Sequence, residues 1–115
     1  MQVSLYRRFE RQLLRLQNKF PLLVDDFEII VDQLERGQIL GDQIPNLAYE
    51  VYKVRLPNRS VKKGKSGGFR VIYYVKTQEL IGMLSIYVKS EQTDIPLPEI
   101  TALIEEFLTQ SDTDE

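Results

Sequence analysis

Three β-rich segments lie close together in the second half of the sequence, at residues 48–56, 69–76 and 80–89. Each is rich in Val, Ile and Tyr, residue types that favour strands. A tight turn near Thr77 and Gln78 joins the last two segments, and a loop rich in lysine and glycine joins the first two. Consecutive strands with links this short pair antiparallel. The sequence therefore predicts a three-stranded antiparallel meander, which leaves few folds open to the rest of the chain.

Helical periodicity flanks this meander on both sides. Apolar residues recur every three or four positions over residues 9–20 and again over 23–34, where Gly37 is a plausible C-cap. A third apolar stripe begins after Pro96 and Pro98. Residues 2–6 alternate like a short strand, and residues 38–46 form a predicted loop. The predicted fold is α+β in the order β-α-α-β-β-β-α, an antiparallel sheet with an N-terminal helical hairpin and a C-terminal helix. Since helices can cover only part of such a sheet, one face stays partly open.

The length and composition exclude several classes of protein. A chain of 115 residues forms one domain, expected at residues 1–109, followed by an acidic, disordered tail at 110–115. The sequence has no cysteine and no histidine, which excludes disulfides, thiol nucleophiles and imidazole or thiolate metal sites. We therefore expect no cofactor and no metal. No apolar run is long enough to cross a membrane and no signal peptide is evident, so a cytoplasmic protein without membrane partners is expected.

Charge is strongly segregated along the chain, although the net charge is only −2. Nine of the 15 lysines and arginines lie between residues 51 and 90, with Glu79 as the one acidic residue in that stretch. This distribution indicates a face that binds a polyanion and an acidic face elsewhere. The alternative is a solvated basic loop without a partner.

The loop between the first two strands contains Gly64-Lys65-Ser66, which raises the question of a nucleotide-phosphate loop. That motif requires an earlier glycine at the position of Arg59 and a helix directly after the loop. The segment that follows, FRVIYYV, has the composition of a strand. The sequence therefore argues against an NTPase and favours a basic loop between two strands.

Strand alternation places basic side chains on one sheet face. Lys53 and Arg55 point to the same side, as do Arg70 and Tyr74, and Tyr87 and Lys89. Arginine and lysine suit backbone phosphates, and tyrosine rings can stack on unpaired bases, although such rings are also common in sheet cores. The candidate RNA-binding residues are Lys62, Lys63 and Lys65 of the loop, with Tyr74 and Tyr87 of the strands.

The segments YKVRLPNRSVKKGKSGGFRVIYYV and MLSIYVKSEQTDI resemble the RelE/ParE toxin superfamily, and most of all its HigB-like branch. The similarity extends over about residues 3–108 and is sharpest at 49–95. It implies a type II toxin of a toxin–antitoxin pair that cleaves mRNA on the ribosome, with the ribosome, mRNA and a cognate antitoxin as partners. The family pattern implies four catalytic positions, Lys53, Arg55, Arg70 and Lys89. It also has a tyrosine near Asp94 and Ile95, which this chain lacks, leaving Tyr87 and Tyr74 as substitutes.

Cleavage of RNA without a metal uses the ribose 2′-hydroxyl as the nucleophile, and it needs a base, an acid and positive charge around the phosphorus. Lys53 is the candidate base, because crowding by Arg55 and the loop lysines favours its neutral form. Arg70 and Lys89 are expected to hold the phosphate, and the acid is unassigned. Two alternatives remain open: a ParE-like gyrase poison that cuts no RNA, and an inactive basic RNA-binding remnant of a toxin.

Overall fold

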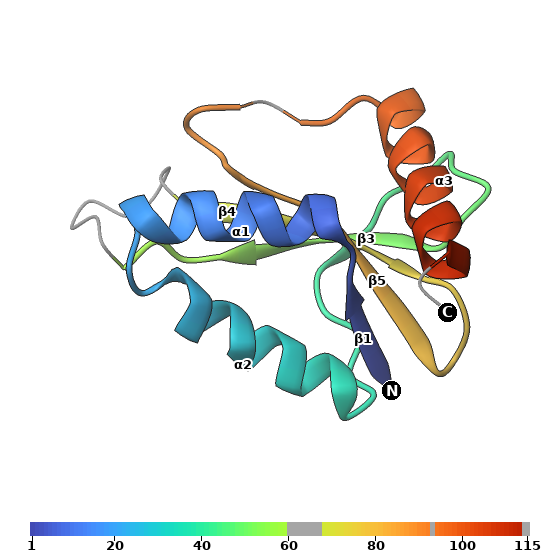
Figure 1. Ribbon diagram of the computed structural model, residues 1–115, viewed down its shortest axis with the longest axis horizontal. Helices are drawn as coiled ribbons and strands as arrows, with labels where there is room; N and C mark the ends of the chain where they lie inside the picture. The colour runs from blue at the N-terminus through green and yellow to red at the C-terminus, as the bar shows by residue number, and fades with distance from the viewer. Residues whose placement is uncertain (60–67, 93, 114–115) are drawn as a thin grey trace.

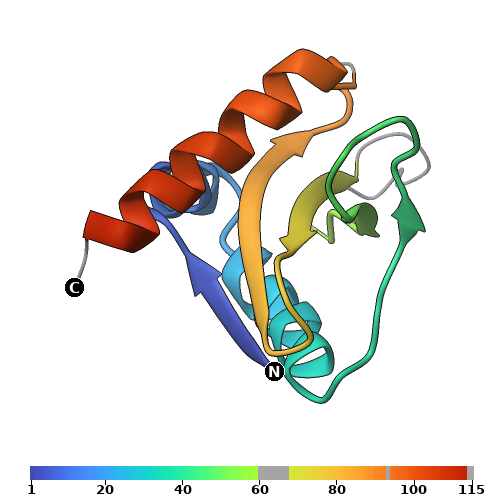
Figure 2. The ribbon, with the colours of Figure 1, turned by 90° about the vertical axis from the view of Figure 1, so that its right-hand side faces the viewer.

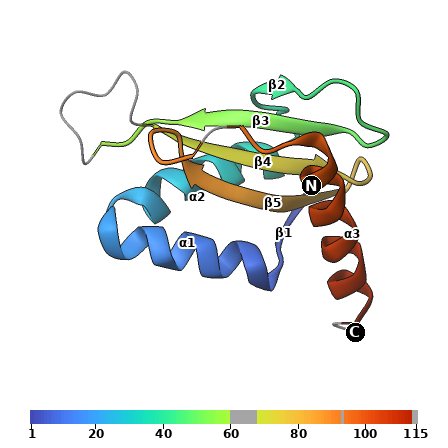
Figure 3. The same cartoon turned by 90° about the horizontal axis from the view of Figure 1, so that it is seen from above.

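The computed structural model describes residues 1–59, 68–92 and 94–113 of the chain, with backbone alone at 111–113. It contains an α+β fold with a mixed sheet whose strand order is β1-β5-β4-β3-β2 (Figures 1 and 3). No helix in these described ranges is both long and apolar enough to cross a membrane. The elements are β1 (Gln2–Leu5), α1 (Arg7–Lys19), α2 (Leu23–Glu35), β2 (Asp42–Gln43), β3 (Val51–Leu56), β4 (Phe69–Val75), β5 (Leu80–Val88) and α3 (Leu97–Thr113).

The predicted meander is confirmed, since β3 pairs antiparallel with β4 and β4 pairs antiparallel with β5. The sheet is not wholly antiparallel, however, because β1 pairs in parallel with the start of β5. A further short strand, β2, lies in the segment predicted as a loop and pairs with Lys53 and Tyr52 of β3. Gly41 brings the chain to that edge, where a Cβ would lie 2.3 Å from the Lys53 carbonyl oxygen. Only glycine permits this approach.

Helices α1 and α2 cover one face of the sheet, and α3 crosses the other face (Figure 2). The helical hairpin buries Phe9 and Leu13 from α1 and Phe27 from α2, at the spacing predicted from the sequence. Gln17 closes the turn between the helices, donating to the Pro21 carbonyl and accepting from the Val24 amide. Since α1 and α2 bury one sheet face along the meander, the opposite face is left for α3 and for the basic side chains.

Helix α3 covers only the part of that face next to β1 and the start of β5. Phe107 of α3 packs edge-on against Tyr74, with ring centroids 6.3 Å apart, and lies over Gly82. The helix continues to Thr113, past residue 110, where the acidic tail was expected to begin. The far ends of β3 and β4 are not covered by this helix, and this is where the candidate site lies (Figure 2).

Candidate active site

A row of polar and charged residues crosses the three strands of the meander. Arg55 on β3 is in register with Arg70 on β4, and Arg70 is in register with Tyr87 on β5. Residues directly opposite one another in a sheet share a face, so both guanidinium groups project from the same side. Like charges placed directly opposite each other destabilise a sheet. Two guanidinium groups at this position therefore add repulsion to the sheet, which an anion bound between them would relieve.

Neither arginine forms an ion pair within residues 1–59, 68–92 and 94–110. Arg55 is exposed, and Arg70 is half-buried with a hydrogen bond from Nη1 to the carbonyl oxygen of the neighbouring Phe69, 3.2 Å long. Both side chains therefore keep donors available for oxygen atoms of a ligand. Two guanidinium forks on adjacent strands form an arrangement that can bind one phosphate from two sides.

Two lysines beside this row share one carboxylate. The Lys53 ammonium lies 3.0 Å from Oδ1 of Asp94, and the Lys89 ammonium lies 3.9 Å from the same oxygen. The hydrogen bond from Lys53, together with its positive charge, lowers the pKa of Asp94 from its usual 3.8. Asp94 is thus an ionised carboxylate at neutral pH, held between two cations.

Lys53, Asp94 and Tyr87 line a pocket of about 390 Å³ on the open sheet face, whereas Arg55, Arg70 and Lys89 lie outside its lining. Its floor comes from the middle of the sheet and its walls come from β2, the segment after β5 and the first turn of α3. Apolar side chains such as Ile72 and Ile100 line it together with the charged groups, so a ligand in the pocket would lose part of its water. The lining residues are Asp42, Gln43, Ile44, Pro45, Lys53, Ile72, Tyr87, Asp94, Ile95, Leu97 and Ile100.

Tyr87 lines this pocket from β5, and its hydroxyl oxygen is buried. The residue is 4% exposed, and its hydroxyl has no hydrogen-bond partner of normal geometry in the described part of the chain. Burial raises the pKa of Tyr87 above its usual 10.0, and the nearby Asp94 carboxylate raises it further. The hydroxyl is therefore protonated at neutral pH. Although it forms no hydrogen bond of normal geometry with the described residues, the Asp94 carboxylate lies close enough to act as its acceptor.

Stacking of Tyr74 or Tyr87 on RNA bases, which the sequence suggested, does not fit the structure. Tyr74 is 7% exposed and its ring packs edge-on against Tyr49 and Phe107. It is a core residue under α3, because its position on β4 falls where that helix crosses the sheet. The Tyr87 ring is equally buried, so no face of either ring is open to a base.

The predicted catalytic residues Lys53, Arg55, Arg70 and Lys89 lie on one side of the sheet. The predicted RNA-binding lysines Lys62, Lys63 and Lys65 fall outside the residues that the structure describes. Sequence reasoning did not assign a role to Asp94. The feature that could have identified it is its position, because Asp94 stands where the toxin pattern has a tyrosine. A single acidic residue in a loop belongs to no periodic pattern, so nothing else in the sequence marks it.

Lys53, the predicted base, forms an ion pair with the Asp94 carboxylate, 3.0 Å from its ammonium. The loop lysines that were expected to crowd it lie outside the described residues.

Comparison with known proteins adds no assignment: no family model matches the chain, and no curated protein matches its sequence.

Proposed function

We propose that this protein is an endoribonuclease toxin of a type II toxin–antitoxin pair, which cleaves mRNA on the ribosome and is held inactive by a cognate antitoxin. Two independent lines support the proposal. One is the resemblance of residues 49–95 to RelE and HigB-like toxins. The other is the chemistry of the open sheet face, where Lys53, an ionised Asp94 and a protonated Tyr87 line one pocket and Arg55 and Arg70 project from the same side of the sheet.

One observation carries the proposal furthest: Arg55 and Arg70 lie opposite each other on neighbouring strands without an ion-pair partner in the described residues. A plain solvated sheet face would place opposite charges at such positions, because these stabilise the sheet. A phosphodiester between the two guanidinium groups removes the repulsion and accepts hydrogen bonds from both. RNA supplies this group at each nucleotide.

The reaction follows from these groups and the 2′-hydroxyl of the substrate. Asp94 accepts the proton of that hydroxyl, whose oxygen then forms a bond to phosphorus. Arg55 and Arg70 hold the phosphate oxygens, on which negative charge grows in the transition state. The bond from phosphorus to the 5′-oxygen breaks, and Tyr87 donates its proton to the departing oxygen. The products are a 2′,3′-cyclic phosphate and a 5′-hydroxyl.

Lys53 and Lys89 serve in this scheme as positioning and charge-balancing residues. Together they hold the Asp94 carboxylate beside the phosphate site, at 3.0 and 3.9 Å from Oδ1. Without them, a carboxylate would be repelled by the phosphate it must approach. The side chain of Asp94 is 64% exposed, so it can adjust when RNA enters.

The cleavage rate should be nearly independent of pH between about pH 6 and about pH 9. Asp94 has a pKa lowered from 3.8 and is in its basic form throughout this range. Tyr87 has a pKa raised from 10.0 and is in its acidic form throughout. Single-turnover cleavage of ribosome-bound mRNA, measured across this range, tests the assignment. If Lys53 were the base, the rate would instead rise about tenfold per pH unit on the acidic side of the profile.

Induced expression without an antitoxin tests the function itself. The proposal predicts growth arrest together with mRNA that is cut within codons on translating ribosomes. Growth arrest with intact mRNA and blocked DNA supercoiling would select the gyrase-poison alternative. Normal growth with abundant folded protein would select the inactive remnant.

A further inference from the structure

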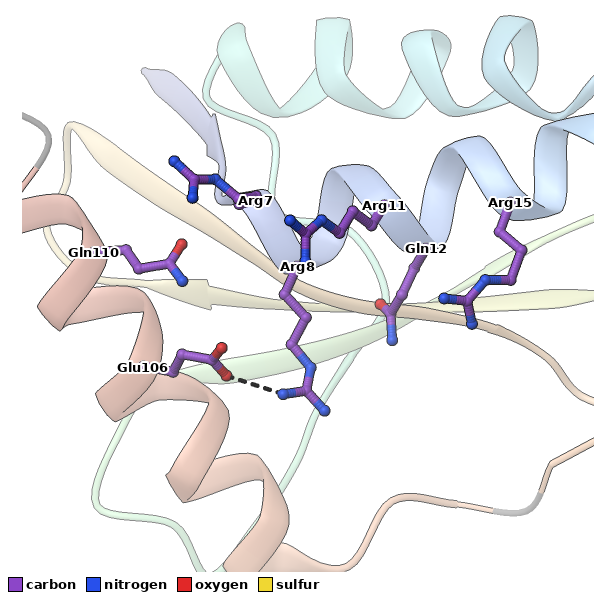
Figure 4. Close-up of a pocket in the computed structure, with 7 residues that line it drawn as sticks. All are labelled: Arg7, Arg8, Arg11, Gln12, Arg15, Glu106 and Gln110. Carbon is purple, nitrogen blue, oxygen red and sulfur yellow. Dashed lines mark hydrogen bonds and ion pairs between the residues drawn. The ribbon is translucent and has the colours of Figure 1, made fainter.

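A second basic surface lies on α1, away from the pocket described above. Four exposed arginines, Arg7, Arg8, Arg11 and Arg15, line a groove of about 360 Å³ between α1 and α3 (Figure 4). Arg7, Arg11 and Arg15 are spaced four residues apart, which corresponds to about 6 Å along a helix. This repeat is close to the separation of successive phosphates along a nucleic-acid strand.

The arrangement destabilises the helix that carries it. Like charges four residues apart repel each other, and cations in the first turn oppose the helix dipole. Of the four arginines of the groove, only Arg8 has an ion-pair partner within the described residues, which is Glu106 of α3 at 3.2 Å. The other three arginines have no such compensation in the described part of the chain. An external polyanion would supply it.

The lining of the groove favours nucleic acid over protein as that polyanion. Besides the arginines, the groove is lined by Gln12, Glu106 and Gln110, so none of its lining residues is apolar. Protein interfaces have an apolar core, whereas nucleic-acid interfaces are more polar and strongly cationic. Arginine forks also match the paired oxygens of a phosphate.

The groove on α1 is connected to the candidate active site by shared residues. A hollow of about 290 Å³ next to it is lined by Gln12 and Arg15, which also line the α1 groove. The same hollow is lined by Tyr87, which also lines the active-site pocket. The three depressions therefore follow one another along the surface, from α1 past the outer edge of β5 to the open sheet face.

We propose that the α1 groove binds backbone phosphates of the RNA strand that extends from the active-site pocket. The inference rests on the proposed function for the identity of the strand, but it concerns binding and not the chemical step. Arg11 and Arg15, nearest the connecting hollow, contact phosphates a few nucleotides from the cleaved bond. Long RNA should accordingly bind more tightly than RNA that fills the pocket alone.

Binding of RNA that cannot be cleaved tests this inference. Two oligonucleotides with a 2′-deoxy residue at the cleavage position are compared, one of about four nucleotides and one of about twelve, which can reach both surfaces. The double variant Arg11→Gln/Arg15→Gln should bind the long RNA about tenfold more weakly and flatten its salt dependence by about 1.4 in log–log slope. Its affinity for the short RNA should remain that of the wild type.

The matched control is Arg36→Gln/Lys76→Gln, which removes the same charge from exposed positions outside the groove. It should bind both oligonucleotides like the wild type. If the double variant binds short and long RNA with equally weakened affinity, or binds both like the wild type, RNA binding by the α1 groove is overturned, while the proposed function is not. Failure of the wild type to bind either RNA overturns the proposed function as well. If a polyglutamate peptide binds the groove as tightly as RNA of equal charge, the groove does not prefer nucleic acid over acidic protein, and this part of the inference is overturned.

Discussion

Replacing Arg70 by alanine should slow single-turnover cleavage of ribosome-bound mRNA by about 10²–10³-fold, the usual cost of losing one charged transition-state contact. Arg70 lies on the central strand of the meander, opposite Arg55, and has a rigid backbone on both sides. Within the described part of the chain its guanidinium forms one hydrogen bond, to the carbonyl oxygen of Phe69, and so contributes little to the fold. The loss should therefore appear in the rate and not in the yield of folded protein.

Two comparisons sharpen this prediction. Arg36→Ala removes an exposed arginine of α2 and its ion pair with Asp32, and it should leave cleavage unchanged. The free energy of unfolding of Arg70→Ala should equal or slightly exceed that of the wild type, because the repulsion from Arg55 is gone. A well-folded Arg70→Ala protein that cleaves mRNA at the wild-type rate would remove Arg70 from the site.

The second large effect concerns the docking of α3. Phe107→Ala should lower the free energy of unfolding by about 3–5 kcal/mol, as expected for a large aromatic residue removed from a core. The ring is 1% exposed and packs edge-on against Tyr6 and Tyr74. It also fits closely over Gly82, where an added Cβ would lie 2.5 Å from the ring. No neighbouring backbone can move in easily to fill the space.

Urea denaturation measures this loss directly, because the midpoint falls while the slope stays that of a two-state transition. Leu14→Ala on α1, a residue that is 62% exposed, is the control and should change stability by less than about 0.5 kcal/mol. A loss below about 1 kcal/mol for Phe107→Ala would mean that α3 does not depend on this ring. Since Leu97 and Ile100 of α3 also line the active-site pocket, the same variant should weaken cleavage.

The meander could be predicted because consecutive strands that are joined by short links can pair with each other only in the antiparallel direction. Its observed strands, Val51–Leu56, Phe69–Val75 and Leu80–Val88, fall within the predicted segments. The parallel pairing of β1 could not be predicted, because alternation within a strand does not say which neighbour it meets. The two residues of β2 are too few for any periodicity, and their position depends on the close approach of Gly41 to β3.

The basic half of the candidate site could be predicted for the same physical reason as the strands. A period of two puts Lys53 and Arg55 on one face, and the register adds Arg70. The role of the tyrosines could not be predicted, because it depends on where α3 crosses the sheet. Asp94 was also out of reach, since a loop residue acquires its partners only from the tertiary fold.

The chemical nature of the RNA ends distinguishes attack by the 2′-hydroxyl from other routes of cleavage. Purified protein is mixed with ribosomes stalled on a defined mRNA, and both ends at the cut are identified by enzymatic labelling and mass spectrometry. Attack by the 2′-hydroxyl, with Asp94 as proton acceptor and Tyr87 as proton donor, predicts a 2′,3′-cyclic phosphate upstream and a 5′-hydroxyl downstream. These ends should be nearly absent with Arg70→Ala. A 3′-hydroxyl with a 5′-phosphate would contradict attack by the 2′-hydroxyl. Intact mRNA in the presence of well-folded wild-type protein would contradict cleavage altogether.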